Sequence, residues 1–133
     1  MSRVVRLGGD PPSPFEDRFG FGRVVAVDGT VFIGGTTSVT PDGMVLGETP
    51  REQAAEILRK IEHELGRVGA TRDDVVLTRC YVTDISRYEE VGYAHGEFFG
   101  TVRPVMTMVG IVALVDPRML VEIEAVAITS ARS

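Results

Sequence analysis

The chain has 133 residues, of which 44% are hydrophobic and 25% are charged, and this size and composition fit one folded domain with its own core. This apolar content can offset the entropy of the chain, which excludes disorder over most of its length. The net charge is −5, without charge blocks, which argues against a binder of nucleic acid or of anionic membranes because such proteins usually present a basic face.

The first 18 residues are expected to form an N-terminal arm or loop of a single domain spanning residues 1–133. Residues 8–18 are rich in Pro and Gly, which is typical of a loose arm or of a fixed loop that covers a site. A hairpin is predicted next, with strands at Val24–Val27 and residues 30–33 around a tight Asp-Gly turn. Paired glycines at 34 and 35 then indicate a bend or a close backbone approach.

Two amphipathic helices are predicted, each from a capping box. Thr49 and Glu52 flank a Pro at the first helical position, and apolar residues follow at helical spacing as far as residue 68. Ser86 and Glu89 form the second box, which predicts a helix that ends at Gly100.

Three further strands are expected at residues 75–83, 105–114 and 120–129. The elements favour an α+β fold in which a mixed β-sheet carries two helices packed on one face. The second face of the sheet is also predicted to be largely apolar, and it favours a homo-oligomer that packs sheet against sheet. Its expected apolar residues are Val75, Leu77, Tyr81, Leu120 and Val126.

Glu122 and Glu124 are two residues apart on the last strand, so both are predicted to lie on the face away from the helices. Such carboxylates can perform acid–base chemistry, or they can pair with arginines or reach solvent. His95 lies on the apolar stripe of the second helix, which is typical of a core or interface residue and also allows a ligand-facing donor.

Cys80 is the only cysteine and has no evident activating base, so it is interpreted as a small core residue. The histidines and this cysteine lack metal-ligand spacing, and we expect neither a metal nor a cofactor. The N-terminus reads as neither a signal nor a transit peptide, and no apolar stretch is long enough to cross a membrane. A cytoplasmic location without membrane association is therefore expected.

Together these segments resemble the Rid family (also called YjgF), whose members include enamine and imine deaminases. The similarity extends from about Gly20 to Ala127 and depends on the order and spacing of several short motifs. These are residues 28–29 leading to 34–36, the helix segment 53–65, and residues 74–76, 81–84, 98–99, 103–104 and 120–125. The resemblance implies a chorismate-mutase-like fold and a homotrimer with its sheets facing a central barrel and three clefts between subunits.

The resemblance also implies roles for single positions. The glutamate associated with the hydrolytic water matches Glu122. The arginine that binds the substrate carboxylate in active deaminases matches Met106, the tyrosine before the hairpin matches Phe21, and the serine of a Ser-Gly-Gln turn matches Gly34. Met106 therefore predicts weak or absent turnover of 2-iminopropanoate. The candidate replacement cations are Arg103, Arg23 and Arg79.

We expect Glu122 to line an intersubunit pocket for a small-molecule metabolite, because a carboxylate on an apolar face is costly unless a cleft solvates it or a partner pairs with it. The other expected lining residues are Thr36 and Thr107 nearby, Phe21 as an apolar wall, Met106 at the arginine position, and Arg103 or His95 at the rim.

Three functions remain open from the sequence. The first is metal-independent hydrolysis of an imine or enamine, with Glu122 positioning water. The second is a non-catalytic trimer that binds a small molecule in the same cleft. The third is an endoribonuclease, which the acidic charge disfavours.

Overall fold

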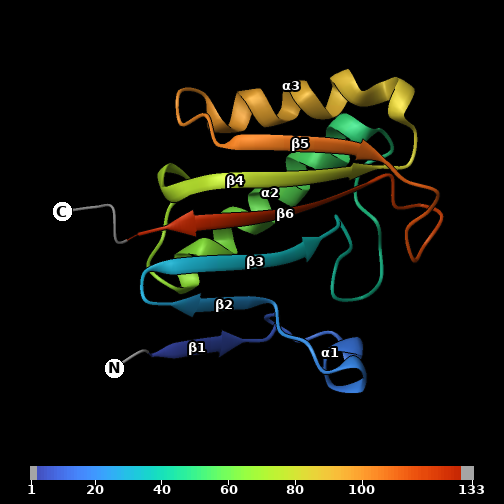
Figure 1. The fold of residues 1–133 in the computed structure, drawn as a ribbon. Coiled ribbons are helices and arrows are strands. Elements are labelled where there is room, and N and C mark those ends of the chain that lie inside the picture. Colours follow the sequence, from blue (N-terminus) through green and yellow to red (C-terminus); the bar gives the residue numbers. More distant parts are fainter. Residues whose placement is uncertain (1–2, 130–133) are drawn as a thin grey trace.

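The computed structural model describes residues 3–129, and the ends of the predicted domain, residues 1–2 and 130–133, lie outside this range. Figure 1 shows one sheet with the long helices on a single side. The elements are β1 (Val4–Leu7), α1 (Pro14–Phe19), β2 (Val24–Val27), β3 (Thr30–Thr36), α2 (Pro50–Arg67), β4 (Val75–Val82), α3 (Tyr88–Phe99), β5 (Val105–Gly110) and β6 (Val121–Ile128).

The sheet has six strands in the order β1-β2-β3-β6-β4-β5. All neighbouring strands are antiparallel except β4 and β5, which are parallel and connected through α3. The last strand of the chain therefore lies inside the sheet, between β3 and β4 (Figure 1). The predicted α+β fold with a mixed sheet and two helices on one face is confirmed.

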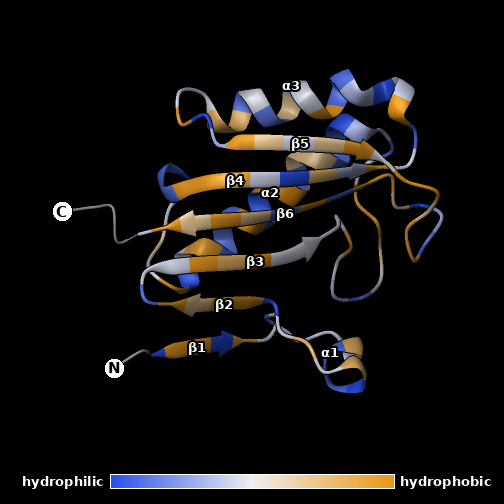
Figure 2. Ribbon diagram, viewed as in Figure 1, coloured by the Kyte–Doolittle hydropathy of each residue, from blue (hydrophilic) through white to orange (hydrophobic). Residues whose placement is uncertain are grey.

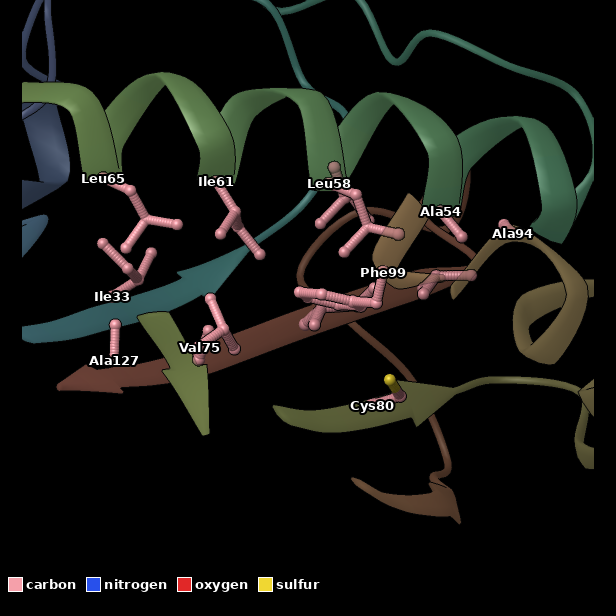
Figure 3. Close-up of a cluster of buried hydrophobic side chains, with 14 of the residues drawn as sticks. Ile33, Ala54, Leu58, Ile61, Leu65, Val75, Cys80, Ala94, Phe99 and Ala127 are labelled. Atoms are coloured by element: carbon pink, nitrogen blue, oxygen red, sulfur yellow. The ribbon is translucent and has the colours of Figure 1, made fainter. Parts of the chain in front are cut away.

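The core lies between α2, α3 and the sheet (Figure 3). The apolar stripe of α2 supplies Ile57, Leu58, Ile61 and Leu65, which are fully buried. This helix begins with the predicted capping box: the Thr49 hydroxyl accepts from the Glu52 backbone N–H, and the Glu52 carboxylate accepts from the Thr49 backbone N–H. The helix is therefore defined both by its cap and by its buried stripe.

The start of α3 differs from the prediction. The Asp84 carboxylate accepts a hydrogen bond from the Ser86 backbone N–H and caps a short 3₁₀ turn at Ile85–Arg87. The Ser86 hydroxyl is bonded to the same carboxylate, and α3 begins at Tyr88 without a side-chain cap. The predicted box at Ser86 is wrong because Asp84, two residues earlier, accepts the turn's backbone donor.

Two residues assigned to the open face of the sheet belong to the core side. The ladder between β4 and β6 shifts register between Val75 and Leu77, so this β-bulge turns Val75 into the core and leaves Val76 exposed. Leu120 precedes β6, where its backbone N–H donates to the Gln53 side chain and its side chain packs against the core.

The N-terminal segment expected as an arm or loop contains both β1 and α1. Ser13 and Glu16 form a capping box around Pro14, and the Glu16 carboxylate also accepts from Gly9 N–H. At the other end of the chain, β5 stops at Gly110 instead of residue 114. Ile111 N–H still bonds to Val82, but β4 ends there and offers no further partner.

Candidate functional site

The sheet face opposite α2 and α3, here called the open face, carries apolar residues beside charged ones. The strands are largely hydrophobic along their length (Figure 2). Phe32 at the centre of this face is 46% exposed, and Val105 at its edge is 66% exposed. Side-chain alternation and strand register place the following residues on it: Val25, Val27, Phe32, Leu77, Arg79, Tyr81, Val105, Thr107, Val109, Glu122, Glu124 and Val126.

Glu122 is half-buried on this face and lies opposite Tyr81 in the ladder between β6 and β4. No residue in the range 3–129 forms a hydrogen bond or an ion pair with its carboxylate. Burial raises the pKa of Glu122, Arg23 opposes the rise, and Glu124 adds to it. A carboxylate held with an elevated pKa and without a partner can exchange a proton with a bound molecule.

A β-bulge in β3 shapes the surroundings of this carboxylate. The register with β6 shifts between Ile33 and Thr36, so that both intervening glycines lie toward the open face. A Cβ atom at Gly35 would lie 2.7 Å from Glu122 Oε2, and one at Gly34 would lie 2.7 Å from Arg23 Nη2. Both side chains therefore lie over space that only glycine leaves free, which is the close approach predicted from the paired glycines.

A second charged group lies beside Glu122 on the same face. The Tyr81 hydroxyl donates a hydrogen bond to Glu124, and Arg79 Nη1 lies 3.7 Å from Glu124 Oε1. The hydrogen bond to Glu124 is the main reason that the pKa of Tyr81 is raised. Glu124 is thus the paired member of the Glu-x-Glu motif, and Glu122 is the unpaired one. Tyr81 was not predicted as part of a site, although its place opposite Glu122 follows once the register is known.

Phe21 and Thr107 occupy different positions relative to Glu122. Phe21 is 46% exposed, and it precedes β2 at the end of the sheet where β3 ends and β6 begins (Figure 1). Thr107 lies on the open face, but it pairs with Arg79, which in turn pairs with Glu124. Thr107 is therefore separated from Glu122 by a strand.

Thr36 and His95 lie on the helix side of the sheet. Thr36 is buried opposite Ile123, with its hydroxyl donating to Gly34 O at 2.8 Å. The His95 ring is buried between α3 and β4, where Nε2 lies 2.8 Å from the Thr78 hydroxyl, and burial lowers its pKa. Within a single chain, both side chains therefore lie on the opposite side of the sheet from the Glu122 carboxylate.

Met106 and Arg103 lie at the far end of the sheet. Met106 pairs with Thr78, a helix-side residue of β4. The first residue of β5 pairs with Leu77, whereas Glu122 pairs with Tyr81. Along the strands, the start of β5 and Glu122 are therefore four residues of β4 apart, or roughly 13 Å. Arg103 precedes β5 with φ +52°, a left-handed conformation that is strained for a residue other than glycine.

Two hollows on the surface of one chain lie away from Glu122. The first, of about 430 Å³, is lined by residues that include Gly47, Gln53 and Arg118; the second, of about 300 Å³, lies between α2 and α3.

Within residues 3–129, no group of three or more His, Cys, Asp or Glu side chains is placed to hold a metal ion. No helix in this range is long and apolar enough to span a membrane. Cys80 is buried, and desolvation raises the pKa of its thiol to about 12.

The fold and the open face define a small α+β protein of the chorismate-mutase-like type, and comparisons with known proteins agree. The family described as Endoribonuclease L-PSP matches residues 15–129. A crystal structure from Mycobacterium tuberculosis, a member of the YjgF/YER057c/UK114 family, superposes with a TM-score of 0.84 at 43% identity, covering 95% of this chain and 99% of that one. A Rid family protein from Yersinia pestis gives a TM-score of 0.80 at 25% identity over 96% and 99% of the two chains.

Sequence relatives point the same way. An uncharacterized protein of Streptomyces coelicolor is 35% identical over 84% of each chain. A RutC family protein of Aquifex aeolicus is 30% identical over 81% of this chain and 87% of its own. The chain belongs to the YjgF/Rid family, as its sequence motifs predicted.

Proposed function

We propose that the protein is a homotrimer that hydrolyses small imines or enamines in clefts between subunits, with Glu122 positioning the water. The observation that carries this proposal is the half-buried Glu122 carboxylate, which has no hydrogen bond or ion pair in residues 3–129 and lies on an apolar sheet face. A second chain that covered this face would turn the open carboxylate into the wall of a closed cleft.

The position of β5 supports a site shared between chains. In one chain β4 separates β5 from β6, and the first residue of β5, which Arg103 precedes, lies roughly 13 Å along the sheet from Glu122. The family resemblance assigns both regions to one substrate site. Both can line a single pocket only if β5 of one subunit lies beside Glu122 of the next.

The chemistry needs a water molecule and a group that moves a proton. The oxygen of water adds to the carbon of the protonated imine while one water proton passes to the Glu122 carboxylate, which gives a carbinolamine. Glu122 returns this proton to the nitrogen, the C–N bond breaks and ammonia leaves. The remaining hydroxyl proton passes to Glu122 as the carbonyl forms, and solvent then removes it. An elevated pKa suits Glu122 for these transfers, because the group must first accept the proton and then release it.

The test is ammonia release from a panel of 2-imino acids produced in the assay by an amino-acid oxidase. Glu122→Gln is expected to lower turnover at least a hundredfold without loss of the trimer. Glu124→Gln is the matched control, because it removes a carboxylate from the same strand face but should leave turnover within a few-fold. Equal loss in both variants, or none in Glu122→Gln, would contradict the proposed role of Glu122.

A second candidate function is a non-catalytic trimer that binds a metabolite in the same cleft. It is favoured by Met106, Phe21 and Gly34, which stand where the resemblance implies arginine, tyrosine and serine. Ligand binding by a wild-type protein that turns over no imine in the panel would support it. Ribonuclease activity, the meaning of the family description, is disfavoured by the net charge of −5.

A further inference from the structure

Arg23 lies at the edge of the Glu122 site and is held there by the backbone of β3. It stands directly before β2 and opposite Gly34, whose N–H donates to Arg23 O at 3.0 Å. Arg23 Nη2 donates to Gly35 O at 2.5 Å. The missing Cβ at Gly34 leaves the space in which the guanidinium lies. The bulge of β3 therefore fixes the position of this cation.

The guanidinium retains unused hydrogen-bond capacity. An arginine side chain has five N–H donors, and residues 3–129 provide an acceptor to Nη2 alone. Nε is buried without a partner, and no carboxylate in this range forms an ion pair with Arg23. Burial lowers the pKa of Arg23 although Glu64, Glu122 and Glu16 oppose the change. A desolvated guanidinium with free donors binds an anion more strongly than an exposed one.

Arg23 and Glu122 lie side by side without closing into an ion pair. Their side chains cover the two neighbouring glycines of one bulge, and each influences the ionisation of the other. Neither group is neutralised by a contact within 4 Å. The pair thus offers one positive and one negative group to a molecule bound above the bulge, with a separation set by two adjacent backbone positions.

We propose that Arg23 binds the carboxylate of the substrate, which is an imine or enamine that carries an acid group, while Glu122 faces its carbon–nitrogen bond. This inference rests on the proposed function of the same site. It moves the anion-binding cation from position 106, which is Met in this chain, to the residue directly before β2, opposite the bulge of β3 that Glu122 covers. The planar guanidinium suits a carboxylate, which it can bind through two parallel hydrogen bonds.

Binding can be measured by calorimetry with 2-oxobutanoate, a stable analogue of the reaction product, and with its uncharged methyl ester. The wild-type trimer is expected to prefer the acid. Arg23→Gln should weaken binding of the acid at least tenfold and leave binding of the ester within twofold. Arg23→Lys keeps the charge but loses the planar geometry, and it should give an intermediate loss. Melting temperature and light scattering establish that each variant is folded and trimeric.

Arg79→Gln is the matched control, since it removes a cation of the same sheet face that lies near Glu124, and it should leave binding of the acid within twofold. Arg103→Gln tests the competing assignment. A tenfold loss in Arg79→Gln or in Arg103→Gln with no loss in Arg23→Gln would overturn the assignment, and so would a wild-type protein that does not distinguish the acid from the ester. Failure of the proposed function is distinguishable: acid binding that depends on Arg23, without turnover of any imine, would refute hydrolysis and leave the anion site in place.

Discussion

At the scale of single residues, Glu122 and Glu124 show how two carboxylates on one strand can differ. Glu124 receives a hydrogen bond from Tyr81 and lies near Arg79, whereas Glu122 has burial without a contact partner. Two carboxylates on one strand face thus have different surroundings. This difference has a measurable consequence for the pH dependence of stability.

Glu122→Gln is expected to raise or preserve the melting temperature at neutral pH. Burial raises the pKa of Glu122 above its usual value of 4.5, so the folded state binds this proton more tightly than the unfolded chain does. The ionised group therefore disfavours folding above its folded pKa, and the penalty disappears as the pH falls toward 4.5. The advantage of the Gln variant should decrease over the same interval in thermal scans.

The control for this measurement is Glu124→Gln, which removes the charged acceptor of the Tyr81 hydroxyl and the partner of Arg79. It should lower the melting temperature at neutral pH or leave it unchanged. A Glu122→Gln protein that is clearly less stable than wild type at neutral pH would mean that the carboxylate is held by a charged partner in the assembled protein.

Some of this residue-level arrangement could be predicted from the sequence. Period-two alternation placed Glu122 and Glu124 away from the helices, because the apolar residues of β6 must face the core. The closeness of Arg23 to Glu122 could not be predicted. It depends on the register of three strands and on a bulge, neither of which is encoded in local spacing.

At the scale of elements, the two helix starts allow a direct comparison. Thr49→Ala removes a hydroxyl that accepts the Glu52 backbone N–H at the start of α2, and should cost about 1 kcal/mol. Ser86→Ala removes a hydroxyl that bonds to Asp84, which keeps its bond to the Ser86 backbone, and should cost only about 0.5 kcal/mol or less. Urea unfolding at equilibrium measures both, and the reverse order would show that Ser86 is the true cap.

The same capping pattern also marks the start of α1, a helix that was not predicted from the sequence. Ser13 and Glu16 bracket Pro14 as Thr49 and Glu52 bracket Pro50. The longer helix was predictable because a buried stripe follows its cap, whereas α1 has six residues and no such stripe. The β-bulge in β4 was also beyond prediction, since a bulge depends on the partner strand and no glycine marks this one. At Val75 this changed the face to which the residue belongs.

At the scale of the whole molecule, the open face is the feature that supports the proposed assembly. Its centre carries Phe32 between Val25 and Val126, and these side chains would remain in water in a single chain. Contiguous apolar surfaces of this kind mark interfaces in soluble proteins. The excess of apolar residues on both sheet faces was evident in the sequence, but the order of the strands was not, because it depends on contacts between distant segments.

Phe32→Lys is expected to convert the proposed trimer into folded monomers at micromolar concentration. Burying a lysine charge between two sheets without a partner costs several kcal/mol of association free energy. Symmetry repeats this cost at each subunit contact. Static light scattering should then report the mass of one chain. Tyr93→Lys, a change of similar size on the exposed side of α3, should leave the mass at three chains. If the trimer persists in Phe32→Lys and dissociates in Tyr93→Lys, the helices and not the open face form the interface.

The position of β6 has a consequence for how the chain reaches this structure. The strand β6 joins β1-β2-β3 to β4-β5, and until residues 121–128 are available the two halves share no strand pairing. Before then, β3 and β4 each present an unpaired edge, which is where chains associate wrongly. Pairing of β3 with β6 also joins segments that lie far apart in the sequence, such as Thr30 and Ile128, which slows folding. We therefore expect the sheet to form only after β6 has been synthesised, and loss of a few residues at the C-terminal end of β6 to affect the whole sheet rather than one edge.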